Sequence, residues 1–236
     1  MRKFLTAKWH DLVMANYEVP PEILAKRVPD GVELDFHEGK CFVSLVAFMF
    51  LDTRVLKIPV PFHINFEEVN LRFYVKRETA AETKRGVVFV KEIVPRFAIA
   101  FVARTFYGEP YEAWQMNHSK TGKTLSYGWR KGAFENSVKV EIGLNKGVPA
   151  ENSHGEFVIE HYWGYTKRGA NRTDEYKVEH PKWELFAVDK YEIKADFGKL
   201  YGAEFAFLNG AKPYSIFMAK GSEISVYKGA KIMDNG

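Results

Sequence analysis

The sequence predicts a mainly β protein, an antiparallel barrel or sandwich of strands with a few short helices outside it. One observation is the aromatic share, 15% of the 236 residues, because aromatic side chains favour strands and the walls of ligand cavities. The other is the succession of short apolar segments separated by turn-rich stretches, with only two or three segments of helical character. Closing roughly ten strands would leave room for a small-ligand cavity. No repeat or linker interrupts the chain, so a single domain over residues 1–236 is expected.

Composition and charge exclude several classes of protein. The hydrophobic share of 46% and the charged share of 27% are typical of a globular chain. The single cysteine excludes an intrachain disulfide framework and a cysteine-rich metal site. The net charge of +4 comes from basic residues interleaved with acids, which predicts no nucleic-acid partner. The longest apolar run, about residues 41–51, is too short for a membrane span, and the N-terminal segment lacks the apolar core of a signal peptide. We therefore expect a cytoplasmic protein without a membrane partner.

In chain order, the first expected element is a short helix that begins at Pro21 and stops at Pro29. Residues 32–37 and 41–50 follow as a hairpin, and the dense apolar pattern of the second strand predicts burial on both of its faces. Residues 66–76 are strongly strand-like.

The rest of the chain adds one further long segment of helical spacing and a run of strands. Residues 86–94 are expected as a strand, and Pro95 opens the segment 96–107, whose spacing suits a helix that Gly108 stops. A short helix is expected within residues 197–208. The remaining expected strands are 125–130, 137–144, 157–166, 176–180, 183–196, 214–219 and 223–228.

The strand at residues 66–76 carries the most informative pattern. Alternation places Glu68, Asn70, Arg72 and Tyr74 on one face and apolar residues on the other. The polar face is either an ordinary solvated face or the lining of a cavity. In a cavity, Glu68 and Arg72 would hold each other ionised, and Arg72 could bind a carboxylate in bidentate fashion.

Other chemistry-bearing residues are less specific. His161 and Tyr162 lie in the aromatic segment 157–166, where His161 is either a catalytic group or a hydrogen-bonded core residue. Lys91 is either a Schiff-base lysine or an outward-pointing strand residue. No histidine spacing is typical of a metal site, so neither a metal nor a cofactor is expected.

Together these motifs resemble the DUF2071 family, also called YqjF-like, a family of uncharacterised proteins. The likeness runs from about Phe4 to Lys228, and its most distinctive part is the strand Glu68-Val-Asn-Leu-Arg-Phe-Tyr-Val75. Further matching segments are Thr6-Ala-x-Trp9, Asn16-Tyr-Glu-Val-Pro20, Ser44-Leu-Val-x-Phe48, Arg85-Gly-Val-Val-Phe89, Glu160-His-Tyr-Trp-Gly-Tyr165 and Gly221-Ser222. The resemblance implies an acetoacetate decarboxylase-like fold, that is, an antiparallel β-barrel or double sheet with a central apolar-lined pocket and a few short peripheral helices.

The chain departs from the decarboxylases where their chemistry resides. Those enzymes carry Arg-Glu-x-x-Gly-x-Pro-Lys-Lys, whose first lysine forms a Schiff base with the substrate. The similar segment here is Arg104-Thr-Phe-Tyr-Gly108-Glu-Pro110-Tyr111-Glu112, in which Tyr111 and Glu112 replace both lysines. A tyrosine cannot form an imine, and a glutamate would raise the pKa of a neighbouring amine. The resemblance therefore implies a pocket without Schiff-base chemistry.

Three hypotheses of function remain open. The first is a lyase- or hydrolase-like enzyme that uses pocket acids and bases on a small apolar or carboxylate-bearing molecule. The second is a small-ligand binding protein without catalysis, and the third is a structural or dimerising protein, such as a homodimer, whose aromatic residues fill the barrel. The candidate catalytic residues are Glu68, Tyr111 and Glu112, and the candidate substrate-binding residues are Asn70, Arg72, Tyr74, Arg104, Tyr107, His161 and Tyr162.

Overall fold

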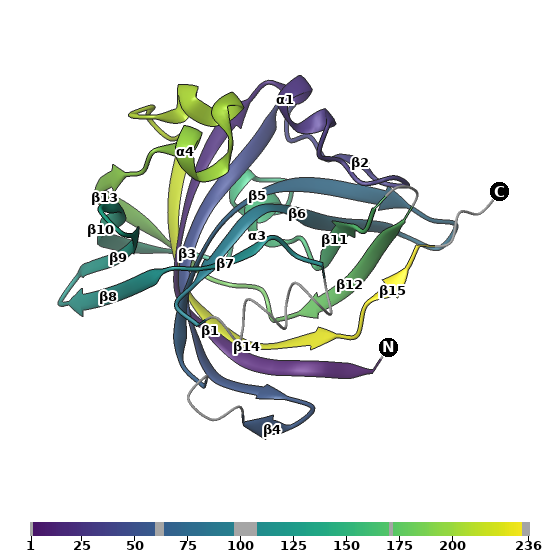
Figure 1. The fold of residues 1–236 in the computed structure, drawn as a ribbon, viewed down its shortest axis with the longest axis horizontal. Coiled ribbons are helices and arrows are strands. Elements are labelled where there is room, and N and C mark those ends of the chain that lie inside the picture. Colours follow the sequence, from purple (N-terminus) through teal and green to yellow (C-terminus); the bar gives the residue numbers. More distant parts are fainter. Residues whose placement is uncertain (1, 60–63, 97–107, 170–171, 233–236) are drawn as a thin grey trace.

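The computed structural model describes residues 2–59, 64–96, 108–169 and 172–232. Within these ranges 15 strands join into one large sheet of antiparallel and parallel pairs, and short helices lie at its periphery (Figure 1). The predicted mainly β fold class is confirmed, and the arrangement fits the double-sheet description.

Seven strands close a ring. Their order is β12–β11–β6–β5–β3–β1–β14, and β14 returns to β12, where Val178 pairs with Val226. Neighbours in the ring are antiparallel except β11 and β6, which run parallel. The seven strands are β1 (Lys3–Val19), β3 (Cys41–Val55), β5 (Phe66–Glu78), β6 (Thr83–Val94), β11 (Trp163–Lys167), β12 (Thr173–Glu179) and β14 (Ser215–Tyr227).

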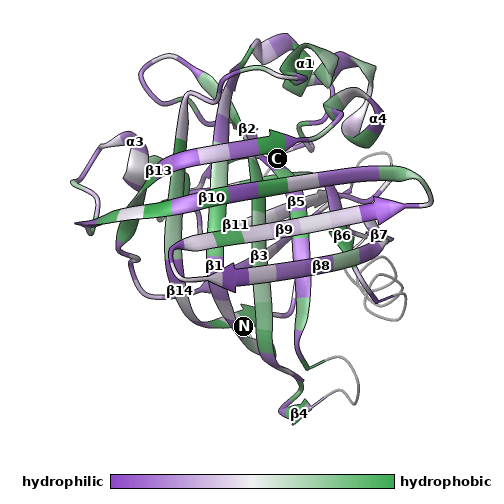
Figure 2. Ribbon diagram, turned by 90° about the vertical axis from the view of Figure 1, so that its left-hand side faces the viewer, coloured by the Kyte–Doolittle hydropathy of each residue, from purple (hydrophilic) through white to green (hydrophobic). Residues whose placement is uncertain are grey.

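A second layer branches from the ring at β14. Leu185 of β13 pairs with Ala219 of β14, and the sheet continues through β10, β9 and β8. Figure 2 shows these strands crossing over β1, β3 and β14. They are β8 (Gln115–Thr121), β9 (Thr124–Lys131), β10 (Phe134–Gly147) and β13 (Leu185–Lys194), and the short strands elsewhere are β2 (Glu33–Leu34), β4 (Ile58–Pro59), β7 (Tyr111–Ala113) and β15 (Ala230–Lys231).

The pattern of β3 explains why two layers form. Residues 41–50 are all buried, as the sequence predicts. On one face, Phe42 and Phe48 belong to the core inside the ring. On the other face, Val43 and Leu45 belong to the core between the ring and the second layer. A strand that is apolar on both faces is stable only when both faces are covered.

Two of the expected helices are present in the structure. The helix α1 (Pro21–Ala25) begins at its proline and ends before Pro29, and the expected short helix within 197–208 is divided into α4 (Phe197–Tyr201) and the 3-10 helix η1 (Ala203–Leu208). The helix expected at 96–107 lies outside the described residues. No helix in the described ranges is long and apolar enough to cross a membrane.

The prediction of a strand over 157–166 is wrong in its first part. The helix α3 (His154–Ile159) ends there, and β11 begins only at Trp163. The hydroxyl of Ser153 accepts the N–H of Glu156, while the Glu156 carboxylate accepts the N–H of Asn152. This Ser-x-x-Glu arrangement is typical of a helix N-terminus, and the alternating aromatic residues that follow obscured it in the sequence.

Two further differences concern β1 and β14. The 17-residue strand β1 was not predicted, because Lys8, His10 and Asp11 interrupt its apolar pattern. The segments 214–219 and 223–228 form the single strand β14, which continues through Gly221 at φ 80°. A Cβ at Gly221 would collide with the carbonyl group of Trp9, so only glycine permits this close pairing.

Candidate functional site

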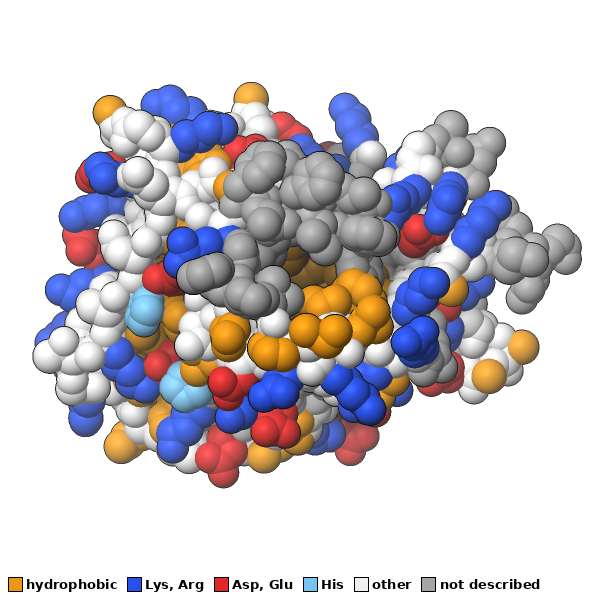
Figure 3. Space-filling view, turned by 60° about the horizontal axis from the view of Figure 1, so that its bottom comes forward, with side chains coloured by type: hydrophobic (Ala, Val, Ile, Leu, Met, Phe, Trp, Pro, Cys, Tyr) orange, Lys and Arg blue, Asp and Glu red, His pale blue; other side chains and the backbone are white. Residues whose placement is uncertain are grey.

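The ring of strands encloses a cavity of about 230 Å³. Most of its lining is aromatic or aliphatic and comes from strands that are distant in sequence. Figure 3 shows a group of hydrophobic side chains beside a hollow in the surface of the molecule. Aromatic residues therefore line the space without filling it. They include Trp9, Phe48, Phe50, Phe66, Phe89, Trp163 and Trp183.

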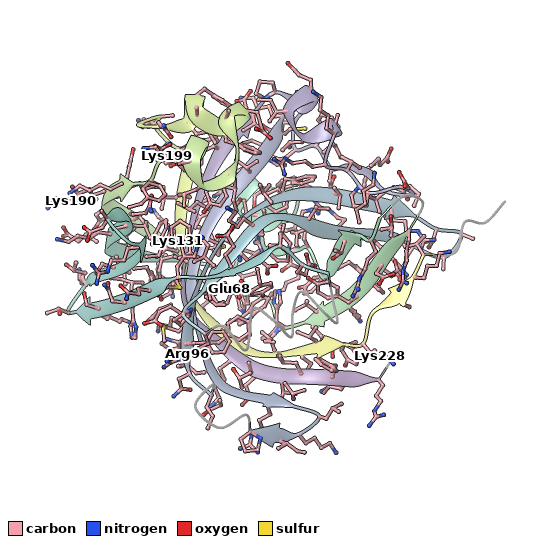
Figure 4. All side chains as sticks on the ribbon, viewed as in Figure 1. Glu68, Arg96, Lys131, Lys190, Lys199 and Lys228 are labelled. Carbon is pink, nitrogen blue, oxygen red and sulfur yellow. The ribbon has the colours of Figure 1, made fainter. Side chains whose placement is uncertain are left out.

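The polar face of β5 lines this cavity. Glu68, Asn70 and Arg72 contribute to its wall, and Glu68 is only 2% exposed. The Asn70 side-chain amide donates to one Glu68 carboxylate oxygen at 3.0 Å, and the Tyr111 hydroxyl donates to the other at 3.0 Å. Figure 4 shows Glu68 between the strands of the ring. Of the two interpretations of this face, the structure supports the cavity lining.

Strand register brings further carboxyl groups to the same place. Asn70 of β5 pairs with Glu92 of β6, and Glu92 pairs with Tyr111 of β7. Glu109 lies just before β7 and accepts a hydrogen bond from the Thr166 hydroxyl at 2.5 Å. Glu68, Glu92 and Glu109, here called the carboxyl cluster, all line the cavity and are all buried.

Burial dominates the electrostatics of the carboxyl cluster. It raises the pKa of Glu68 and of Glu109 to about 7, although hydrogen bonds from neighbours partly oppose the shift. Burial raises the pKa of Glu92 well above its usual value, and the charges of Glu109 and Glu68 raise it further. Because like charges repel strongly away from water, the cluster retains protons at neutral pH. It therefore combines a proton donor and proton acceptors in one apolar cavity.

The expected ion pair between Glu68 and Arg72 is absent from the described residues. Instead, the Arg72 guanidinium donates to the Val158 carbonyl at 3.2 Å. The positive charge of Arg72 lowers the pKa of Glu68 only in part, against the larger effect of burial. The expectation that the two residues keep each other ionised is therefore wrong for Glu68.

Three of the described candidate residues do not line the cavity wall, namely Glu112, Tyr162 and Tyr74. Glu112 forms an ion pair with Lys91 at 2.9 Å, and despite partial burial, hydrogen bonds from Lys91 and Trp114 lower its pKa to about 2. Tyr162 donates its hydroxyl to Glu160 at 2.9 Å. Neither Glu112 nor Tyr162 belongs to the residues that bound the cavity.

The remaining candidates are placed as follows. Tyr74 is buried next to the cavity wall, where its hydroxyl lies 2.5 Å from that of Ser44. His161 lines the cavity, and its Nε2 lies 3.0 Å from the Asp35 carboxylate. Arg104 and Tyr107 lie outside the described residues.

The cavity wall contains buried polar atoms that find no hydrogen-bond partner within the described ranges. Buried polar groups are nearly always satisfied in folded proteins, so such a concentration is typical of a site that receives a ligand or water. The atoms are Trp9 Nε1, Thr53 Oγ1, Asn70 Oδ1, Arg72 Nε, Glu92 Oε2 and His161 Nδ1.

Lysine is missing from the cavity. Every lysine of the chain lies in the described ranges, and none of them lines the cavity. Lys91, the candidate for imine formation, is paired with Glu112 outside it. Within the described residues, no group of histidine, cysteine, aspartate or glutamate side chains could hold a metal ion.

The sequence analysis missed Glu92, Glu109, Tyr176 and Asp35. The signal for Glu92 is a carboxylate inside an otherwise apolar strand, next to Lys91 on the opposite face. Glu109 stands between a glycine and a proline in the segment already compared with the decarboxylases. Tyr176 forms a side-chain hydrogen bond with Glu109, which only strand pairing could reveal.

Sequence comparison gives two matches. The profile of the DUF2071 family, described as an uncharacterized conserved protein, matches residues 6–223. The uncharacterized protein YqjF of Bacillus subtilis (strain 168) is 32% identical over 120 residues, or 50% of this chain and 48% of that protein. The match thus spans about half the length of this curated relative.

Structure comparison gives neighbours that cover almost the whole chain. An acetoacetate decarboxylase from Legionella pneumophila superposes with a TM-score of 0.69 at 13% identity, covering 99% of this chain and 89% of that one. The enduracididine biosynthesis enzyme MppR complexed with pyruvate superposes with a TM-score of 0.67 at 11% identity, covering 100% and 93%. An acetoacetate decarboxylase-like enzyme from Sphingomonas wittichii RW1 superposes with a TM-score of 0.64 at 10% identity, covering 98% of this chain and 94% of that one. At these identities the similarity shows the fold alone.

Proposed function

Since the chain belongs to the DUF2071 family and has the acetoacetate decarboxylase-like fold, we propose that its cavity binds a small, mostly apolar or carboxylate-bearing organic molecule and performs acid/base chemistry on it. The observation that carries this proposal is the carboxyl cluster, Glu68, Glu92 and Glu109, buried in an otherwise apolar cavity. Carboxyl groups with raised pKa values in a cavity are candidates for proton transfer at neutral pH.

The reaction class that suits this arrangement is proton transfer next to a carbonyl group. Glu68 takes a proton from the carbon beside the carbonyl, and the C–H electron pair becomes a C=C bond. Glu92, which holds its proton at neutral pH, gives that proton to the carbonyl oxygen, so the product is an enol. Tyr111 donates a hydrogen bond to Glu68 and holds that carboxylate in place. In a lyase acting on a 3-hydroxy carbonyl compound, Glu68 would instead take the proton of the hydroxyl group. The bond between C2 and C3 would then break to release an aldehyde or ketone, and Glu92 would protonate the carbonyl oxygen of the remaining fragment to give an enol.

An imine route is not part of the proposal. Imine formation needs a lysine in contact with the substrate, and no lysine lines the cavity. Arg72 supplies a guanidinium at the wall, with its Nε without a partner among the described residues, and this group suits the carboxylate of a substrate. The pyruvate complex of MppR supports a small carbonyl acid as the class of ligand for this fold.

Phenylpyruvate is a suitable probe, because it combines an aromatic ring, a carboxylate and exchangeable protons beside a carbonyl group. We expect the protein to accelerate the exchange of those protons for deuterium in D2O, and proton NMR measures the rate of this exchange. Glu68→Gln and Glu92→Gln should each slow the exchange by about 100-fold or more. Glu67→Gln is the matched control, because Glu67 is the preceding residue, does not line the cavity, and contacts His118 of β8 with its carboxylate.

Borohydride is added in a parallel experiment with phenylpyruvate or acetoacetate. The protein mass should remain unchanged, and a trapped adduct would contradict the proposal. Saturable binding of phenylpyruvate without exchange would instead favour the second hypothesis, a binding protein, which the apolar lining also suits.

We also propose a cytoplasmic setting, in which the buried thiol of Cys41 stays reduced.

A further inference from the structure

Asp35 and His161 form a buried pair at the cavity wall that the proposed chemistry does not use. The Asp35 carboxylate lies 3.0 Å from His161 Nε2 and accepts a hydrogen bond from Arg85 Nε at 2.8 Å. The backbone N–H of Asp35 donates to the Tyr74 carbonyl at 3.0 Å, which fixes the aspartate in place. The rings of Tyr74 and Phe157 pack against the imidazole, with distances between ring centroids of 4.7 and 5.0 Å. The ring of His161 therefore has one defined orientation.

The charges around the pair determine which imidazole nitrogen carries the proton. Burial alone would raise the pKa of Asp35, but hydrogen bonds from His161 and Arg85 hold it below its usual value, so the carboxylate only accepts. Burial, together with the charges of Arg85 and Arg72, lowers the pKa of His161 to about 4 despite the hydrogen bond to Asp35. A neutral ring that donates from Nε2 leaves Nδ1 as an acceptor.

Nδ1 of His161 is buried, and none of the described residues donates to it. Arg72 Nε, on another residue of the same wall, is a buried donor that likewise has no described partner. One unpaired acceptor and one unpaired donor on the wall of a single cavity suit a ligand that carries the opposite pair of groups. A 2-hydroxy acid, or the enol of a 2-keto acid, carries both, a carboxylate that accepts and a hydroxyl that donates.

We propose that His161 accepts a hydrogen bond from the hydroxyl group of a 2-hydroxy acid or enol, while Arg72 receives its carboxylate and Asp35 acts as the positioning residue of His161. The proposal deepens the proposed function and rests on it in one respect, that a carboxylate-bearing molecule occupies the cavity. It does not depend on the proton transfers assigned to the carboxyl cluster.

Two acids that differ by one hydroxyl group test the proposal. The wild-type protein should bind one enantiomer of 3-phenyllactate about tenfold more tightly than 3-phenylpropanoate, measured by calorimetry. In His161→Phe, which keeps a ring for packing, the two acids should bind equally. Asp35→Asn should reduce the preference while retaining binding of 3-phenylpropanoate. His154→Gln is the matched control, because His154 is also partly buried but lies outside the cavity wall, and the preference should be unchanged.

A second readout needs no ligand. In protein with nitrogen-15-labelled histidine, NMR should show the His161 proton on Nε2 between pH 8 and pH 5, and Asp35→Asn should redistribute it. A proton on Nδ1, or a preference for 3-phenyllactate that survives in His161→Phe, overturns the role of His161. If neither acid binds while the proton lies on Nδ1, both proposals fail. If neither acid binds while the proton lies on Nε2, the carboxylate-bearing ligand class of the proposed function fails and the hydroxy acid proposal fails with it, and only the position of the proton on His161 stands.

Discussion

Replacing Glu68 by glutamine should change how the stability of the protein depends on pH. Burial raises the pKa of Glu68 from 4.5 to about 7, so the folded state binds this proton more tightly than the unfolded state. The stability that Glu68 contributes is therefore fully present below pH 4.5 and is lost as the pH rises through about 7. One pKa unit corresponds to about 1.4 kcal/mol, so the whole effect is about 3 kcal/mol, of which about 2 kcal/mol or more falls between pH 5 and pH 8.

Glutamine keeps the shape of the side chain and can still accept from Tyr111, but it does not ionise. The free energy of unfolding of Glu68→Gln minus that of wild type should therefore be larger at pH 8 than at pH 5. The increase should be about 2 kcal/mol or more. Urea unfolding at both pH values measures this difference. Glu135→Gln is the control, because Glu135 is an exposed carboxylate on β10. The free energies of unfolding of wild type and Glu135→Gln should differ by the same amount at pH 5 and at pH 8. A Glu68→Gln difference that is the same at pH 5 and pH 8 would refute the reasoning.

Three further outcomes are expected. Glu112→Gln should leave phenylpyruvate exchange unchanged and cost about 1 kcal/mol of stability through the lost pair with Lys91. Because the pKa of Glu112 is lowered to about 2, that cost is present above pH 4.5 and disappears as the pH falls through about 2, which acid titration of both proteins measures. Gly164→Ala should destabilise the protein by about 1–3 kcal/mol and weaken phenylpyruvate binding, since a Cβ there collides with the Tyr176 ring at the cavity wall. Gly39→Ala, with nothing near its Cβ but a φ of +75°, should cost about 1 kcal/mol and leave binding unchanged in the same calorimetric assay.

Local patterns were sufficient for most strands and for one wall of the site. Alternation along residues 66–76 groups Glu68, Asn70 and Arg72 on one face, and the structure places all three at the cavity. Two-sided burial of residues 41–50 also follows from composition, because a strand without a polar face has no side to expose to water. The mainly β fold class followed from the pattern of strands, and the family resemblance added the acetoacetate decarboxylase-like type of fold.

Local patterns failed where a distant partner decides the outcome. The charges in β1 argue against a strand until β3 and β14 are known to pair with it on both sides. The aromatic alternation in residues 157–166 is compatible with a strand, and only the capping pair Ser153 and Glu156 indicates that a helix begins at His154 and runs into this segment.

The sequence by itself determined the residue types available for chemistry. It placed Tyr111 and Glu112 in the segment that resembles the lysine-bearing decarboxylase motif, and it supplied the polar face of β5. Only the tertiary structure decided that Glu92 and Glu109 join Glu68 and that Glu112 pairs with Lys91 away from the cavity. The physical reason is that a pKa depends on burial and on neighbouring charges, and both are set by which strands pair and in which register.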